Sequence, residues 1–171
     1  TVIELPAALN VVLDAIYDTK RATHASVFLL DSLGMSFALQ GHRGPAPQKL
    51  LEARSHPAVF AHLVKERTPI LREAVQRRVG EPRQKETLTE DAAPKAPTSL
   101  DEAILRGLDA LGADLVVPLR TAGGVVGLLC LRDERLADAY ASDEIAALIE
   151  VADQLAITTE NSRLFGLLKE R

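Results

Sequence analysis

The stretch LVVPLR at residues 115–120, the turn TAGG at 121–124 and the stretch VVGLLCLR at 125–132 decide the fold of this chain. The two stretches are nearly continuous runs of β-branched and aliphatic residues, and the glycine-rich turn between them is typical of a β-hairpin. Strands that are apolar along their whole length predict a sheet that is covered on both faces. We therefore expect this hairpin to form part of a sheet with helices packed on either side.

Hydrophobic periodicity predicts the elements around the hairpin. The expected helices cover residues 6–21, a short segment at 47–54, a segment opened by His56-Pro57, residues 100–111, and residues 142 to the chain end. The expected strands cover residues 25–31, 35–41 and 70–72. Segment 76–99 is polar, with prolines and charges of both signs, which is typical of a flexible loop or insertion. This order of elements favours the α+β class, an antiparallel sheet with helices on both faces.

The last predicted helix is unusually long. It begins at Ser142, a good N-cap residue, and runs for about 28 residues, or roughly 42 Å. A domain of this size cannot cover such a helix along its whole length, so we expect its end, residues 157–171, to project and to pair with a second copy. The apolar residues expected to form this dimer helix are Leu148, Leu155, Leu164, Phe165 and Leu168.

The composition is that of one globular domain. The chain has 171 residues, of which 47 % are hydrophobic, and a net charge of −4. Its acidic balance and its aromatic content of 4 % argue against nucleic-acid binding, which needs basic patches and stacking faces. No apolar run approaches the ~20 residues of a membrane-spanning helix, and the single cysteine excludes an intrachain disulfide. We therefore expect a cytoplasmic domain with no membrane in this segment.

The residues that could carry chemistry form no recognisable catalytic or metal-binding motif. His56 and His62 are six residues apart, so on a helix they would point in different directions and could not share a metal ion. Cys130 lies in an apolar strand, where a thiol is typically a small buried side chain. We therefore expect no catalytic residue and no metal site, and we do not expect the chain itself to be an enzyme.

The sequence resembles a GAF domain, most specifically over residues 114–168. VPL at 117–119 and GGVVGLL at 123–129 are similar to the hairpin of that family. Tyr140, Asp143, ADQLA at 152–156 and ENSRLF at 160–165 are similar to its closing helix, and ASVFLLD at 25–31 is similar to its first strand. The resemblance implies a single sensor domain over 1–171, with a PAS-related, six-stranded antiparallel sheet, helices on both faces and a long C-terminal helix.

The resemblance also implies a regulatory role in sensing a small molecule. The ending is most similar to GAF domains of bacterial sensor histidine kinases, so we expect a homodimer, an output domain after residue 171 and a two-component signalling protein as the parent. The resemblance also implies that the dimer helix, with its extension at 157–171, is the signalling helix that relays the ligand state to that output domain. The cofactor stays unknown, because no haem or bilin motif is evident. The residues expected to line a ligand pocket are Phe28, Phe37, Leu39, Phe60, Leu63, Arg72, Val117, Leu119 and Cys130, with Arg72 able to pair with an anionic ligand.

Two other functions stay open at this point. The chain could be a ligand-free dimerisation or interaction module with a fully packed core. Less favoured is a redox sensor or enzyme that uses Cys130, because a single cysteine leaves no resolving partner.

Overall fold

The computed structural model describes residues 5–18, 22–80, 96–135 and 140–169, with the side chains of residues 80, 96–99 and 165–169 left out of the description. The helices are α1 (Leu5–Asp18), α2 (Pro57–Ala61), α3 (Arg72–Gly80), α4 (Ala96–Leu111) and α5 (Ser142–Lys169), with a π-helical turn η1 (His62–Glu66). The strands are β1 (His24–Leu30), β2 (Ser36–Arg43), β3 (Leu50–Glu52), β4 (Ile70–Leu71), β5 (Leu115–Thr121) and β6 (Gly124–Arg132).

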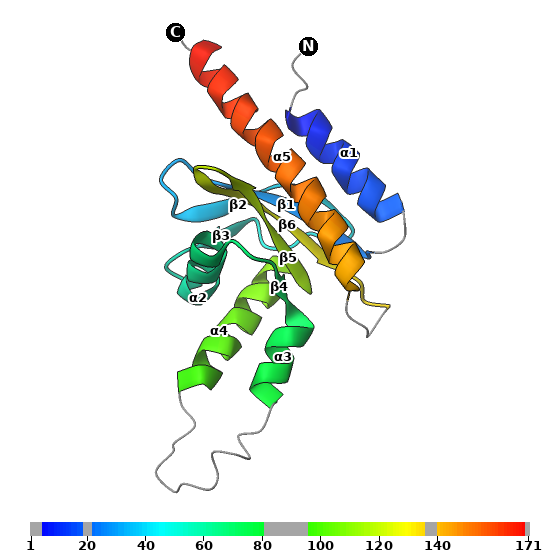
Figure 1. Ribbon diagram of the computed structural model, residues 1–171, viewed down its shortest axis with the longest axis vertical. Coiled ribbons are helices and arrows are strands. Elements are labelled where there is room, and N and C mark those ends of the chain that lie inside the picture. The colour runs from blue at the N-terminus through cyan, green and yellow to red at the C-terminus, as the bar shows by residue number, and fades with distance from the viewer. Residues whose placement is uncertain (1–4, 19–21, 81–95, 136–139, 170–171) are drawn as a thin grey trace, which may run out of the picture.

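The strands form one antiparallel sheet of six, in the order β3-β2-β1-β6-β5-β4. This arrangement confirms the α+β class and the six-stranded antiparallel sheet. Helices α1 and α5 lie side by side over one face, while α2, α3 and α4 lie on the other (Figure 1). The hairpin β5–β6 occupies the middle of the sheet next to β1, so both of its faces are buried.

Each face of the sheet has its own hydrophobic core, because successive side chains of a strand point to opposite sides. The core under α2–α4 takes Phe28, Val116, Leu128 and Cys130 from the central strands. The core under α1 and α5 takes Val27, Val117, Leu119, Leu129 and Leu131 from the same strands. The continuous apolar runs of β5 and β6 therefore serve two cores, as their sequence predicts.

The prediction of a short helix at 47–54 is wrong, because this segment contains β3. Leu51 is buried and pairs with Phe37 of β2. A strand of only three residues shows no alternation that could separate it from a helical turn. The predicted loop 76–99 is also too long at both ends, since α3 runs to Gly80 and α4 begins at Ala96. The rest of that segment, 81–95, lies outside the described residues.

Helix α4 packs closely on α2, and both helices cover the core under α2–α4. A Cβ atom on Gly107 would lie 2.2 Å from Cγ2 of Val59, so only glycine permits this approach.

Helix α5 begins at Ser142 as predicted, and the Glu144 carboxylate accepts a hydrogen bond from the Ala141 amide at 2.9 Å. Over the described residues, no helix combines the length and the apolar character needed to cross a bilayer.

Candidate functional site

The structure divides the residues that the sequence assigned to a ligand pocket between two cores. Phe28, Phe37, Phe60, Leu63 and Cys130 belong to the core under α2–α4, and Leu39 packs against it. Val117 and Leu119 face α1 and α5 on the opposite side of the sheet, so they cannot share a cavity with the other seven. The rings of Phe37 and Phe60 contact each other at a centroid distance of 4.8 Å and a tilt of 39°, which shows how closely this core is filled.

An open pocket of about 310 Å³ lies beside this core, and we call it the α4–β1 pocket. It is lined by residues 24–26 at the start of β1, 45–48 after β2, 109–112 at the end of α4, and Arg132 at the end of β6. Ser26 pairs with Cys130 and His24 with Arg132 across β1 and β6. These side chains therefore share the face of the sheet that carries α4.

Arg132 is a lining residue whose hydrogen-bonding capacity is largely unused. Within the described part of the chain, its guanidinium donates no hydrogen bond and has one ion pair, with Nε 4.0 Å from Oδ1 of Asp114. Its side chain is 39 % exposed, which leaves the guanidinium accessible from the pocket. An arginine with free N–H groups in a pocket is suited to bind a carboxylate or phosphate.

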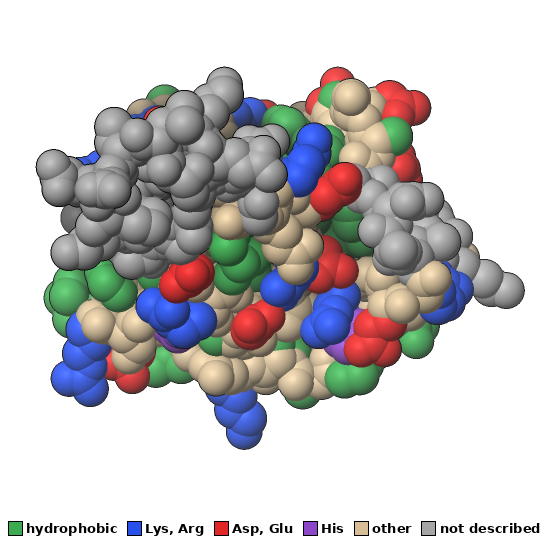
Figure 2. All heavy atoms as spheres, turned by 90° about the horizontal axis from the view of Figure 1, so that it is seen from below, with side chains coloured by type: hydrophobic (Ala, Val, Ile, Leu, Met, Phe, Trp, Pro, Cys, Tyr) green, Lys and Arg blue, Asp and Glu red, His purple; other side chains and the backbone are tan. Residues whose placement is uncertain are grey.

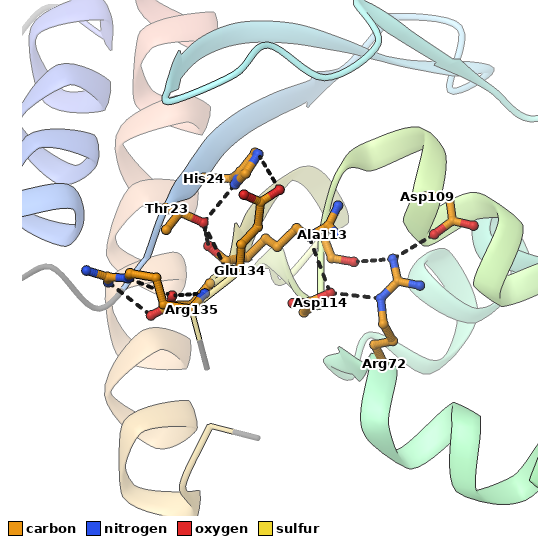
Figure 3. Close-up of polar contacts among 10 residues, drawn as sticks. Thr23, His24, Arg72, Asp109, Ala113, Asp114, Glu134 and Arg135 are labelled. Atoms are coloured by element: carbon orange, nitrogen blue, oxygen red, sulfur yellow. Dashed lines mark hydrogen bonds and ion pairs between the residues drawn. The ribbon is translucent and has the colours of Figure 1, made fainter. Parts of the chain in front are cut away.

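Arg72 is committed to partners inside the protein. Its Nε donates to Asp114 Oδ1 at 2.8 Å, and its Nη2 lies 2.9 Å from Asp109 Oδ1 and 3.0 Å from the carbonyl oxygen of Ala113 (Figure 3). The side chain is only 17 % exposed. These contacts attach the start of α3 to the loop between α4 and β5, so the arrangement does not favour the ligand-pairing role predicted for Arg72.

His24 is held on the other side of the pocket by Thr23 and Glu134. Its Nδ1 lies 2.9 Å from Thr23 Oγ1, and its Nε2 lies 3.8 Å from Glu134 Oε1 (Figure 3). Thr23 Oγ1 also contacts the carbonyl oxygen of Arg132 at 3.2 Å and accepts the amide of Glu134 at 3.0 Å. This polar network fixes the residues at the start of β1 and the end of β6. It holds Arg132 in position through the backbone carbonyl oxygen of that residue.

Cys130 is buried next to the pocket and is in an environment that opposes thiol chemistry. Burial raises the pKa of the Cys130 thiol well above its ordinary value, and the hydrogen bond with Ser26 offsets only part of that shift. A nucleophilic or redox-active cysteine needs the opposite, a lowered pKa and access to solvent. The structure therefore disfavours the use of Cys130 as a reactive residue.

The raised pKa of Cys130 predicts a stability change at alkaline pH. The thiol stays protonated in the folded protein, while the unfolded chain loses this proton above about pH 8.5. The contribution of this thiol to the free energy of unfolding is therefore complete below that pH. Above it the free energy of unfolding falls, by up to about 1.4 kcal/mol per pH unit. Urea unfolding from neutral pH to about pH 10 should show this decline in the native protein and a shallower one in Cys130→Ala. Equal slopes in the two proteins would contradict the buried, protonated thiol.

Arg120 connects the two faces of the sheet at the end of β5. Its Nε and Nη2 donate to Oδ1 and Oδ2 of Asp153 on α5 at 3.1 and 2.9 Å. Its Nη1 donates to the carbonyl oxygen of Arg67 at 3.4 Å. Arg67 has a φ of +57° and ends the π-helical turn η1 on the other face. The hydrogen bonds with Asp153 also raise the pKa of Arg120. The sequence does not reveal this bridge, because its residues are far apart in the chain.

The residues predicted for a dimer helix do not share one surface. Leu155 is buried in the core and Leu148 packs against it, so both serve the domain's own interior. Leu164 is 51 % exposed, and the side chains of Phe165 and Leu168 lie outside the described residues. A different set forms what we call the outer face of α5, exposed residues in alternating steps of three and four: Ala147, Glu150, Gln154, Ile157, Asn161 and Leu164.

Other possible ligand or metal sites are weaker candidates than the α4–β1 pocket. A hollow of about 520 Å³ between α1 and α5 is lined mostly by apolar side chains, with Glu144 beside them: Ala15, Ile16, Leu131, Tyr140, Ala147 and Leu148. In the described ranges, histidine, cysteine, aspartate and glutamate do not gather in groups of three that could hold a metal ion. His62 contacts Thr68, and His42 contacts the carbonyl oxygen of Gly44.

Comparison with known proteins extends the resemblance seen in the sequence. The family model for the GAF domain matches residues 4–158. A GAF domain from a phosphoenolpyruvate-protein phosphotransferase of Coxiella burnetii is similar in structure, with a TM-score of 0.63 and 19 % identity over 96 % of this chain and 87 % of that one. At these identities the likeness shows the fold alone. No significant match was found among curated proteins.

Two further solved structures are similar to this chain. A domain of a protein assigned as a two-component sensor histidine kinase, from Sinorhizobium meliloti 1021, has a TM-score of 0.51 and 22 % identity over 95 % of both chains. The second GAF domain of DevS from Mycobacterium smegmatis has a TM-score of 0.57 and 13 % identity over 98 % of this chain and 99 % of that one.

Proposed function

Because the chain belongs to the GAF domain family, we propose that it is the small-molecule-sensing and dimerisation domain of a cytoplasmic bacterial signalling protein. GAF domains are typically regulatory domains that bind small molecules in signalling proteins. We favour a sensor histidine kinase as the parent protein, since a domain assigned to that class shares 22 % of its residues with this chain. In this proposal the chain has no catalytic role of its own, and an output domain follows residue 171.

The observation that carries the proposal is the α4–β1 pocket and its place in the sheet. The pocket is open, is lined by charged and polar groups, and has a volume at the lower end of the range for small-molecule sites. Arg132, which lines it, follows Leu131 in β6, and Leu131 faces the core under α5. A ligand that shifts the end of β6 would therefore act on a strand that supports the long helix.

Arg120 offers a second route between the two faces. η1 and β4 do not line the α4–β1 pocket, and Arg120 lies at the opposite end of the β5–β6 pairing from Arg132. A change in η1 would move the carbonyl oxygen of Arg67, to which Arg120 donates while it also donates to Asp153 of α5. Single π-helical turns are rare and often lie at functional sites, so η1 is a suitable element to move. A ligand that favours one arrangement of these groups would shift the population of α5 positions.

Arg120→Ala tests whether this bridge couples the two faces. The pair is partly exposed, at 34 % and 40 %, so we expect a loss of no more than about 1 kcal/mol in the free energy of unfolding. We also expect faster amide hydrogen exchange in both η1 and the middle of α5, measured by mass spectrometry. Arg54→Ala is the matched control, because Arg54 is 84 % exposed and pairs with Glu52, two residues away in the chain. Faster exchange in one of the two elements alone would contradict the coupling.

The sensing function itself is tested by a thermal-shift screen of the chain against a library of bacterial metabolites. A compound that binds the folded protein raises its melting temperature, by an amount that grows with ligand concentration. We expect at least one such compound. If none changes the melting temperature and the protein is still a dimer, the ligand-free dimerisation module becomes the better account. An enzyme based on Cys130 is the least favoured alternative because its thiol is buried and protonated.

A further inference from the structure

The charges around the α4–β1 pocket come from two opposite sides. Arg132 lies at the end of β6, and its guanidinium has hydrogen-bonding groups to spare. The other side is the last turn of α4, where Asp109 has a side chain that is 69 % exposed. The C-terminal end of a helix carries a partial negative charge, so this side favours a cationic group. The carbonyl oxygens of Leu108, Asp109 and Ala110 already accept hydrogen bonds from backbone amides, so the exposed carboxylate of Asp109 is the acceptor that a ligand would meet.

The charge balance of the pocket argues against a ligand that is only an anion. Arg132 and Asp109 line the pocket, and Arg72 and Asp114, which pair with them, lie outside its lining. Together these four residues contribute two positive and two negative charges. An added carboxylate or phosphate would leave this group with a net negative charge next to the end of α4. Basic and acidic side chains are likewise interleaved on the face seen in Figure 2, with no large area of one sign.

We propose that the α4–β1 pocket binds a small zwitterion of the α-amino acid class. The carboxylate pairs with the guanidinium of Arg132, which can donate two parallel hydrogen bonds to it. The ammonium group faces Asp109 and the carbonyl end of α4. The charges of the pocket then stay balanced, and its volume of about 310 Å³ limits the ligand to a small molecule. This inference rests on the proposed sensing function and specifies its ligand class.

Titration calorimetry on the whole chain tests the ligand class directly. The zwitterion arm is a panel of neutral L-α-amino acids, the anion arms are acetate and inorganic phosphate, and the cation arm is ethylamine. We expect one or more amino acids to bind, and acetate, phosphate and ethylamine to bind at least about tenfold more weakly, because each satisfies only one side of the pocket. Phosphate or acetate binding as tightly as the best amino acid would overturn the zwitterion assignment.

Two variants test the position of the site. Arg132→Gln should weaken binding of the best amino acid at least about tenfold, and Asp109→Asn should weaken it as well. Arg132 is 39 % exposed and has one weak ion pair, so its replacement should leave the melting temperature nearly unchanged. Arg54→Gln makes the same chemical change far from the pocket and should bind like the native protein.

The outcomes separate this inference from the proposed function. If no amino acid binds, the inference is wrong, while the metabolite screen still decides whether the domain senses another molecule. If a compound from the screen binds equally well to the native protein and to Arg132→Gln, the sensing function stands and this site is not where it acts. Loss of binding in both pocket variants, with the control intact, supports the inference.

Discussion

Gly127→Ala is expected to lower the free energy of unfolding by about 3 kcal/mol, because a methyl group has no room at that position. Gly127 lies in β6 between Leu29 of β1 and Leu119 of β5. A Cβ atom there would lie 2.4 Å from the carbonyl oxygen of Phe28 and 2.9 Å from Cδ2 of Leu29. The carbonyl is part of the central ladder and cannot move aside without breaking strand pairing. Urea unfolding at equilibrium measures the loss.

Gly123→Ala is the matched control for this substitution. Gly123 lies in the turn of the same hairpin, and its nearest neighbour would be Thr121 Oγ1 at 3.8 Å, an ordinary contact. We expect a change within about 0.5 kcal/mol, since alanine also reduces the entropy of the unfolded chain. If both substitutions had the same small effect, the close approach of β1 to Gly127 would not be a feature of the folded protein.

Ile157→Asp is expected to dissociate the proposed dimer, with a dissociation constant raised at least about thirtyfold. Ile157 is 51 % exposed and sits in the middle of the outer face of α5, where the steps of three and four match a heptad seam. In a symmetric dimer the substitution replaces the apolar contact of Ile157, between Gln154 and Asn161, with two carboxylates close together. Sedimentation equilibrium measures the change in association.

The substitution should leave the fold intact, because the side chain is not part of either core. Val64→Asp is the control, since Val64 is 40 % exposed on η1, on the opposite face of the sheet. We expect Val64→Asp to associate like the native protein. A dimer that persists unchanged in Ile157→Asp would show that the outer face of α5 is not the interface.

Local patterns were enough to predict most of the fold. The β5–β6 hairpin and the long helix from Ser142 carry strong signals, a glycine turn between apolar runs in one case and an N-cap before a periodic segment in the other. β3 was missed because Leu50–Glu52 is too short to show a period, and its strand character comes from pairing with β2. Helix α3 was partly assigned to a loop because its polar composition hides the buried Val75.

The candidate site was harder to predict, because its residues meet only in the folded chain. When both faces of a strand are apolar, composition does not show which residues share a face, and Val117 and Leu119 were grouped with the wrong core for that reason. Arg72 was predicted to pair with an anionic ligand, but its partners Asp109 and Asp114, some forty positions away in the chain, could not be foreseen. Arg132 could have been found from its spacing, since it lies two residues after Cys130 and therefore on the same face.

The central claim is that binding on the α4 side of the sheet reaches α5 on the other side. Amide hydrogen exchange of the native chain, with and without the amino acid that raises its melting temperature most, measures this directly. The account predicts slower exchange in the α4–β1 pocket and also around Asp153 of α5, which does not line that pocket. Protection confined to residues 24–26, 45–48, 109–112 and 132, with α5 unchanged, would contradict it.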